Sequence, residues 1–502
     1  MKGFKILAIF LALITVLSCF AACGNVNENT ETTNPNESSD LPEKKLDEWG
    51  REYIDDTVPK ELSFADKEDN TLTFFTRSND SYWAIEMDVD KTTNDTVNDA
   101  IFYRNDTVEQ RLGVTIEQIS QPFDFGGQWN QTLRNSVLTK SGDYQAAAIF
   151  ASQSCGLATE GMYLDVNKLN YLDLDKPWWN QRSREELELF NTLYFLTGDI
   201  AITQLLNAGM ITYNKRLLET YYNDLDIYKL VDDHKWTIDK LYEMTSNVHE
   251  DLNSSGIVDD GDTVGLVHWQ YDSKDGGFID LWVGALGISL TTKDESGIPQ
   301  ITVYNDHSIQ AFEKLQKLCV DNPSCLDQTK LSLTKFENSK ALFSTNILKM
   351  CEGFRNMSDP YGALPLPMFD EDQGYYGTYS QNGCSLIVVC SALPEEQRDM
   401  VGATLELMAA ESYRQVTPAY MEVCLRSKYS DSPDDARMYD LIVDGISMDF
   451  GYIYSSKNIG YMISLFRDLT SDFAQDYESN KILYETSLET LIDKLDEVSF
   501  MQ

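Results

Sequence analysis

The sequence has few of the features that mark catalytic or nucleic-acid-binding chains. Its 502 residues hold 40 Lys and Arg against 81 Asp and Glu, a formal net charge of −41, whereas nucleic-acid binding needs a basic surface. The chain contains no His-Glu-x-x-His, Gly-x-Ser-x-Gly, P-loop or Gly-x-Gly-x-x-Gly motif, which argues against several large enzyme classes. The four histidines lack the spacing of metal ligands; they are His234, His249, His268 and His307.

These exclusions leave open the possibility that the chain is a glycosidase. Such an enzyme needs two carboxylates on either side of the scissile bond. Among 81 acidic residues some suitable pair is always available. Composition therefore does not decide between a secreted carbohydrate-active enzyme and a binding protein.

Cysteines are present, but their spacing does not indicate a disulfide framework. The chain has nine cysteines and no Cys-x-x-Cys pair. Two lie near the N-terminus, and the remaining seven are an odd number, so at least one of them is unpaired or intermolecular. We expect most of the seven to be small buried hydrophobic side chains, although Cys319 and Cys325 could close a local loop. The seven are Cys155, Cys319, Cys325, Cys351, Cys384, Cys390 and Cys424.

The N-terminal residues have the pattern of an export signal. Lys2 and Lys5 flank the start of a short apolar run, and small residues then lead to Cys23. Residues 1–22 are predicted to be a signal peptide, because the run is too short for a stable spanning helix. "Phe-Ala-Ala-Cys" resembles a bacterial lipobox, with Cys23 as the lipidated residue (palmitate is one such lipid). Cys19 is the alternative, and a plain cleaved signal or an uncleaved anchor stays open.

The segment after Cys23 is predicted to be a tether. Its first residues are almost entirely Asn, Thr, Glu and Ser, a composition that cannot bury enough apolar surface to order itself. We therefore expect residues 23–65 to be the lipidated cysteine and a flexible linker. No later run of about 20 apolar residues appears.

Strand and helix patterns alternate in the next part of the chain. Residues 71–77, 114–119 and 144–151 read as strands, and the segments between them have apolar residues at helical spacing. This alternation predicts a parallel sheet covered by helices. Ligands of such sheets bind outside the carboxyl ends of the strands. The loops there carry Tyr82, Trp83, Phe123, Phe125 and Gln153.

A series of weak motifs then runs in a fixed order. They are "GDYQAAAIFASQSCGLATEGMYLDVNKL", "KPWWNQ", "LYFLTGDIAI", "AGMITYNKRLLE", "KWTIDKLYEM", "FENSKALFST" and "ALPLPMFDEDQGYYGTYSQNG". Together they resemble the extracellular solute-binding lipoproteins of ABC sugar importers, in the maltodextrin-binding-like branch. The sequence departs from the family where Ser339 replaces a usual Gly, and where His234-Lys235 stands in place of a frequent Pro.

The resemblance implies an α/β fold of two lobes, the periplasmic-binding-protein-like fold, with each lobe a sheet flanked by helices and the ligand cleft at the hinge. Lobe 1 is expected at 66–198 and 383–429, and lobe 2 at 199–382 and 430–502. The implied function is non-catalytic. The chain would be a receptor on the extracellular face of the bacterial cytoplasmic membrane. It would capture a carbohydrate, expected to be an oligosaccharide, by hinge closure and deliver it to an ABC permease. The alternatives are a secreted carbohydrate-active enzyme and a peptide-binding surface lipoprotein.

The expected sugar contacts combine aromatic faces with hydrogen-bonding side chains, because sugars present both C–H faces and hydroxyls. We choose the candidates by their position in the chain, next to predicted strand ends, at the predicted hinges or within the family motifs. They are Tyr82, Trp83, Gln153, Trp178, Trp179, Gln204, Arg355, Tyr376, Tyr379 and Asn382.

One loop, Asp251 to Asp262, has the oxygen spacing of a calcium-binding EF-hand loop. A strand rather than a second helix is predicted after it, so we expect a structural Ca²⁺ rather than a sensor. Some relatives carry such an ion between a helix and a strand. An acidic solvated turn without metal is the alternative. The ligands implied are Asp251, Asn253, Ser255, the carbonyl of Ile257, Asp259, and Asp260 or Asp262.

Overall fold

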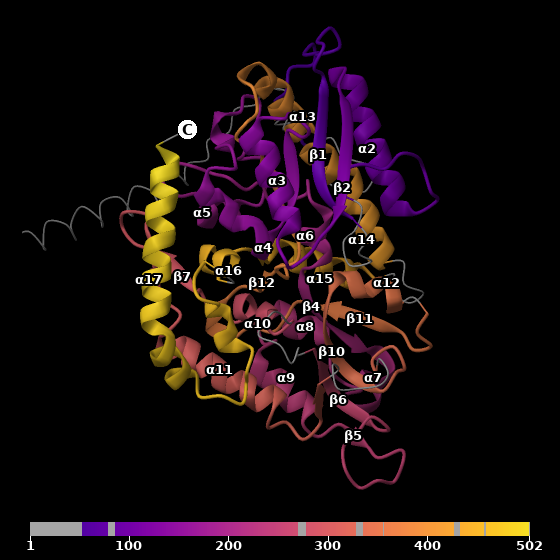
Figure 1. Cartoon of the computed structure of the whole chain (residues 1–502). Coiled ribbons are helices and arrows are strands. Elements are labelled where there is room, and N and C mark those ends of the chain that lie inside the picture. The colour runs from indigo at the N-terminus through magenta and orange to yellow at the C-terminus, as the bar shows by residue number, and fades with distance from the viewer. Residues whose placement is uncertain are drawn as a thin grey trace, which may run out of the picture. The chain divides into compact units, whose positions relative to one another are not determined.

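The computed structural model describes residues 53–78, 86–269, 278–327, 335–354, 356–425, 432–455 and 458–500. Residues 54–502 form one compact unit, and its elements are labelled in Figure 1. Cys23 and the predicted signal and tether up to residue 52 lie outside the described residues, as do Tyr82, Trp83 and Arg355. Among the described residues, no helix has the length and apolarity that a membrane crossing requires.

The first sheet is built mostly from the segment in which alternation was predicted. Within the described residues it has four strands in the order β13-β3-β1-β2. Strands β1, β2 and β3 are parallel, as predicted, whereas β13 runs antiparallel to β3, so the sheet is mixed and not wholly parallel. The strands are β1 (Thr71–Ser78), β2 (Thr115–Pro122), β3 (Ala146–Phe150) and β13 (Ser385–Val389). The helices nearest in sequence are α2 (Thr96–Leu112), α3 (Gln128–Thr139) and α13 (Arg398–Glu411).

Local sequence explains the bounds of α2. The side chain of Asp95 accepts hydrogen bonds from the amides of Val97 and Asn98, which caps the first turn. Gly113 ends the helix with φ 66°, a left-handed conformation that glycine adopts without steric cost. The predicted apolar stripe is confirmed at Ile101, Val108 and Leu112, which are buried.

The second sheet follows in sequence. Within the described residues its strand order is β11-β4-β10-β6-β5, with β9 also paired to β6. Its strands are β4 (Gly209–Asn214), β5 (His249–Glu250), β6 (Thr263–His268), β9 (Cys325–Asp327), β10 (Ala341–Ile347) and β11 (Tyr361–Leu364). Helices of the same region are α7 (Lys215–Tyr221), α8 (Ile227–Asp232), α9 (Ile238–Thr245), α10 (Asp280–Ala285), α11 (Asp306–Cys319) and α15 (Pro433–Asp444). The predicted strand at 263–269 is thus confirmed as β6, and Ser339 takes a left-handed φ of 59° where a glycine was the expected residue.

Two chain segments cross between the sheets, and we call them the crossing segments. The first, residues 196–209, contains α6 (Ile202–Leu206), and the second, residues 378–385, begins with β12 (Thr378–Tyr379). The amide of Gln381 donates to the carbonyl of Asn207 at 2.8 Å, so the two segments run side by side. Gly198 fixes the start of the first crossing, because a Cβ there would lie 2.1 Å from the carbonyl oxygen of Trp178.

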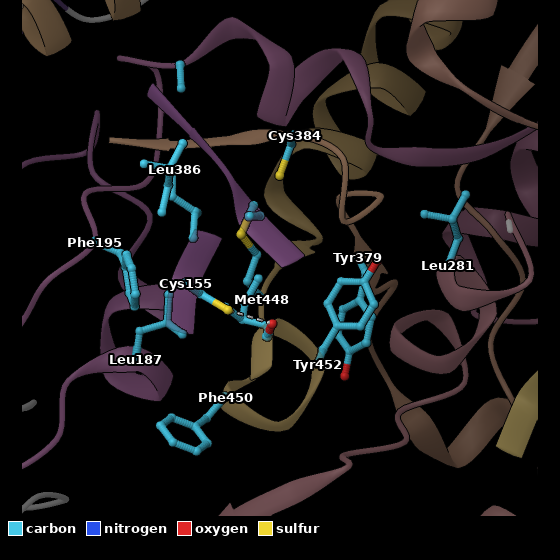
Figure 2. Packing of buried hydrophobic residues seen from close by; sticks show 14 of the residues in the cluster. Cys155, Leu187, Phe195, Leu281, Tyr379, Cys384, Leu386, Met448, Phe450 and Tyr452 are labelled. Carbon is cyan, nitrogen blue, oxygen red and sulfur yellow. Dashed lines mark hydrogen bonds between the residues drawn. The ribbon is translucent and has the colours of Figure 1, made fainter. Parts of the chain in front are cut away.

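The C-terminal elements contact both sheet regions. They are β14 (Ile446–Ser447), α16 (Phe450–Tyr454), η8 (Met462–Phe466) and α17 (Phe473–Ser499). The thiol of Cys155, which follows β3, donates to the carbonyl of Ile453 in α16 at 3.3 Å. Helix α17, the long yellow helix of Figure 1, packs on η1 (Cys155–Glu160) at one end and on β8 (Pro299–Ile301) and α11 at the other. Figure 2 shows the apolar packing around this junction, including Met448, Leu386 and Tyr452.

The cysteines whose side chains the structure describes form no disulfide with one another. Cys155, Cys319, Cys351, Cys384 and Cys390 are buried, as expected for small hydrophobic side chains, and Cys325 is half-buried. Cys319 and Cys325 do not form the local disulfide that their spacing allowed. Burial raises the pKa of the Cys384 and Cys390 thiols to about 12, so both stay protonated at neutral pH.

Candidate functional site

The carboxyl ends of β1, β2 and β3 meet at one edge of the first sheet, where parallel-sheet proteins bind their ligands. Three phenylalanine rings gather there. The Phe123 centroid lies 4.8 Å from that of Phe150 and 5.6 Å from that of Phe125. Phe150 is 6% exposed, whereas Phe125 is 74% exposed. An aromatic ring held open at this edge offers a face against which the C–H face of a sugar can pack.

Arg77 joins these rings to the second crossing segment. Its guanidinium carbon lies 5.0 Å from the Phe150 centroid, a cation–π arrangement. Its two terminal nitrogens donate to the carbonyl of Gly383 at 2.8 Å and to the hydroxyl of Ser385 at 2.5 Å. We call Arg77, Phe123, Phe125 and Phe150 the edge cluster. A ligand on the edge cluster would contact side chains that are bonded directly to a crossing segment.

Two predicted contact residues lie beside the edge cluster. Asn130 donates to the carbonyl of Gln153 at 2.9 Å, and the amide of Ser152 donates to the carbonyl of Asn382 at 3.2 Å. Gln153 follows the carboxyl end of β3, and Asn382 lies in the second crossing segment. The structure therefore places Gln153 at the expected edge and Asn382 in the crossing segment next to it, and their contact with ligand stays a prediction.

Other predicted contacts lie on a different cavity. A pocket of about 290 Å³ is lined by residues of the first crossing segment, of the segment before it, and of α14 (Thr417–Leu425), α15 and β14. Trp179 and Gln204 line this pocket, which we call the hinge pocket, whereas no edge-cluster residue does. Gln204 accepts a hydrogen bond from the amide of Gly198 and donates to the carbonyl of Ser385 at 2.9 Å.

The tandem tryptophans share one buried acid. The Trp178 and Trp179 indoles donate to the Glu406 carboxylate at 3.1 and 2.9 Å, and the amide of Asp173 also donates to it. Burial raises the pKa of Glu406 to about 7, and these hydrogen bonds oppose that rise. Trp178 is fully buried, and Trp179 forms part of the hinge-pocket wall. Of the two indoles, Trp179 lies on the pocket wall and Trp178 does not.

The two predicted tyrosines are buried. The Tyr376 hydroxyl donates to the carbonyl of Val231 at 2.9 Å. Tyr379 stacks on Tyr452 with centroids 4.5 Å apart, and its hydroxyl lies 3.1 Å from the carboxylate of Asp449. Burial raises the pKa of Asp449 to about 7, against hydrogen bonds from two backbone amides. Tyr379 and Asp449 also line a second cavity of about 290 Å³.

No local sequence pattern marks Phe150, Glu406 or Asp449 as site residues. Phe150 is simply the last residue of an apolar strand, and no local pattern marks it as part of an exposed cluster. Glu406 lies in the middle of α13, and its partners are more than 220 positions away in the chain. Long-range contacts such as these leave no signal at the residue itself.

In the predicted calcium loop, carboxylate side chains accept hydrogen bonds from backbone amides of the same loop. Asp251 accepts from the amides of Ser255 and Gly256 at 3.1 and 2.9 Å. Asp262, fully buried, accepts from the amides of Leu252 and Asp259. These atoms are of the type that Ca²⁺ prefers, but an ion would have to replace the amide donors.

Lysines reach the loop as well. Lys335 donates to the carbonyls of Asp260 and Asp262, at 3.0 and 2.6 Å. In the part of the chain that the structure describes, no group of three or more His, Cys, Asp or Glu side chains is arranged to hold a metal ion. The remaining predicted ligands, Asn253, Ser255, Ile257 and Asp259, are exposed or half-buried in the same turn, and the calcium assignment stays a prediction.

Comparison with known proteins identifies the fold. No family model and no curated protein matches the sequence. The chain has the two-lobe α/β fold of periplasmic binding proteins. A cyclo/maltodextrin-binding protein solved with maltotetraose superposes with a TM-score of 0.50 at 11% identity, over 85% of this chain and 97% of that chain. The predicted resemblance to maltodextrin-binding-like proteins is confirmed at the level of the fold.

Two further solved structures are similar over comparable lengths. The GacH receptor of Streptomyces glaucescens, solved unliganded and with acarbose, has a TM-score of 0.48 at 15% identity, over 85% of this chain and 98% of that chain. The substrate-binding protein Lmo0181 of Listeria monocytogenes, solved with cycloalternan, has a TM-score of 0.46 at 11% identity, over 86% and 98%.

Proposed function

We propose that this chain is a lipid-anchored extracellular substrate-binding protein that captures an oligosaccharide and delivers it to an ABC permease. The edge cluster carries the proposal. It combines an exposed ring, Phe125, with a guanidinium, Arg77, at the sheet edge where proteins with parallel sheets bind ligands. The two-lobe fold, shared with a maltodextrin-binding protein, supports the same function.

Capture would work through the crossing segments. Phe123 and Phe125 would pack against the C–H faces of the sugar, and Arg77 would donate hydrogen bonds to hydroxyl groups. Arg77 also holds Gly383 and Ser385 of the second crossing segment. A sugar bound there that makes further contacts in the closed form would shift the population toward closure.

The anchor and the partner complete the proposal. Cys23 would carry the lipid, and the acidic linker after it would hold the folded unit away from the outer face of the membrane. Closure would bring the two lobes into the arrangement that the permease binds. The partner ATPase would supply the energy of transport.

A panel of ligands tests this function. Malto-, xylo-, manno- and galacto-oligosaccharides, uronate oligomers and short peptides would each be added to the purified chain, and the melting temperature and any products measured. A ligand of the folded state raises the melting temperature by mass action. We expect a shift with one class of glycan and no product. A peptide shift without a glycan shift would refute the sugar assignment, and product formation would show an enzyme.

The calcium loop is a separate part of the proposal. A structural ion would join the end of α9 to β6 and stabilise the second sheet region. We expect millimolar calcium to raise the melting temperature of the wild type and a chelator to lower it, with both effects lost in Asp251→Asn. Asp294→Asn is the matched control, because Asp294 also accepts amide hydrogen bonds in an exposed turn. No calcium shift in the wild type would leave the loop as a metal-free turn.

A further inference from the structure

The hinge pocket is a cavity that the proposed sugar site does not use. Its wall comes from four parts of the chain: the segment at 177–182, the first crossing segment, Thr417 of α14, and the end of α15 with β14. Its volume of about 290 Å³ lies close to the lower end of the range of about 300–1,000 Å³ that is usual for small-molecule sites. A molecule bound there would contact both the crossing segment and elements on either side of it.

The amide side chains on this wall are already paired within the protein. Asn180 accepts from the amide of Ser183 and donates to the carbonyl of Ile446 at 2.9 Å. The Gln181 side chain donates to the carbonyls of Leu174 and Trp179, at 2.7 and 3.0 Å. Gln204 uses both ends of its amide, as described above. A polar ligand would have to compete with these bonds and would gain little from them.

What the wall offers instead is apolar surface. The residues that provide it are Pro177, Trp179, Ile202, Leu205, Val443 and Ile446. Two exposed charged side chains of opposite sign, Arg182 and Asp444, also line the pocket. Removing apolar surface from water stabilises a complex. The chemistry therefore favours a neutral ring or hydrocarbon with one polar end directed at the exposed charges.

We propose that the hinge pocket is a second binding site, which takes a small aromatic or aliphatic molecule and changes the affinity of the sugar cleft. The bonded path between the two sites is short. Gln204 on the pocket wall donates to the carbonyl of Ser385 at 2.9 Å, and the hydroxyl of Ser385 accepts from Arg77 of the edge cluster at 2.5 Å. A ligand that binds one arrangement of the crossing segments more tightly than another changes the affinity of the other site for its own ligand. The effect is reciprocal, because each ligand changes the affinity for the other by the same factor. The binding claim stands on the pocket alone, whereas the coupling claim rests on the proposed sugar binding.

The probe is 4-(trifluoromethyl)benzyl alcohol, a neutral aromatic molecule with one hydroxyl, observed by fluorine NMR with the full folded chain. Val443→Trp fills the pocket from a half-buried position and should abolish probe binding. Val320→Trp is the matched control, because Val320 is an exposed valine that does not line the pocket. Val443→Asp, which places a charge on the apolar wall, should weaken probe binding at least tenfold and covers the case in which the tryptophan variant does not fold.

Equal probe binding by the wild type, Val443→Trp and Val443→Asp would overturn the site, as would loss of binding in the Val320→Trp control. The second readout is the affinity of the glycan found in the panel, with and without saturating probe, for which we expect a change of about fivefold. An unchanged glycan affinity with the pocket occupied would overturn the coupling. If the probe binds and no glycan does, the proposed function fails while the binding site stands, so the two failures are distinguishable.

Discussion

The edge cluster and the hinge pocket lie on either side of Ser385, yet they offer opposite chemistry. The edge cluster holds an aromatic ring open to solvent beside a guanidinium. In the hinge pocket the amides are bonded within the protein, and the accessible surface is mainly apolar. A sugar needs both stacking and hydrogen-bond donors, so only the first region suits it. Residue type alone does not distinguish the two regions, since both contain aromatic and polar side chains. The exposure of the aromatic ring separates them, because Phe125 is 74% exposed at the edge cluster whereas Trp179 on the pocket wall is 3% exposed.

The largest expected effect comes from breaking the support of the hinge pocket. Glu406→Ala leaves the Trp178 and Trp179 indoles and the amide of Asp173 without their acceptor. Unpaired buried donors cost about 1–3 kcal/mol each, so we expect the free energy of unfolding to fall by about 3 kcal/mol or more. Urea unfolding measures this. Glu160→Gln, at an exposed ion pair with Arg134, is the comparison and should cost less than about 1 kcal/mol. Equal losses for the two variants would contradict the account of this wall.

A smaller effect is expected from the edge cluster, and it should appear in binding rather than stability. Phe125→Ala removes a ring that is 74% exposed, so the unfolding free energy should change by less than about 0.5 kcal/mol. Glycan affinity should fall about tenfold, equivalent to about 1.4 kcal/mol. Isothermal titration calorimetry measures this. Ile482→Ala, which removes an exposed residue of α17, should change neither quantity. Unchanged glycan affinity in Phe125→Ala would contradict the placement of the sugar site at the edge cluster.

The smallest effect concerns pH. The pKa of Asp449 rises from its ordinary 3.8 to about 7 because the group is buried. The folded state therefore binds the proton more tightly than the unfolded state. Stability from this group is full below pH 3.8 and is lost as pH rises to about 7.

The slope from this one group is about 1 kcal/mol per pH unit within that window. Urea unfolding at pH 5.5 and 6.5 should show wild-type stability falling and a shallower fall in Asp449→Asn. Glu406 contributes in the same direction, because burial also raises its pKa to about 7. An equal or steeper fall in Asp449→Asn would contradict the assignment.

Local signals predicted the first part of the fold well. The succession β1-α2-β2-α3-β3 follows from alternation, apolar spacing and the glycine at position 113, all of which act over a few residues. The antiparallel β13 was not predicted, because its partner β3 lies more than 230 residues earlier in the chain. The lobe boundaries inside this unit stay a prediction.

The candidate site was predicted less well, for the same physical reason. Gln153 was placed at the correct sheet edge and Asn382 in the second crossing, because position along a strand or crossing is a local property. Whether an aromatic ring is buried depends on distant partners. Tyr376 and Tyr379 bond to Val231 and Asp449, and no feature of the hinge sequence distinguishes them from the exposed Tyr375.

The central claim is capture of a sugar with movement of the two sheet regions. Spin labels at Leu138→Cys on α3 and Glu243→Cys on α9, both exposed positions, report the distance between the regions by pulsed electron paramagnetic resonance. With the glycan found in the panel, we predict that the distance distribution shifts to shorter values, and that it stays unshifted in Phe125→Ala at the same glycan concentration. A glycan that binds the wild type at full occupancy without changing this distance would contradict the account.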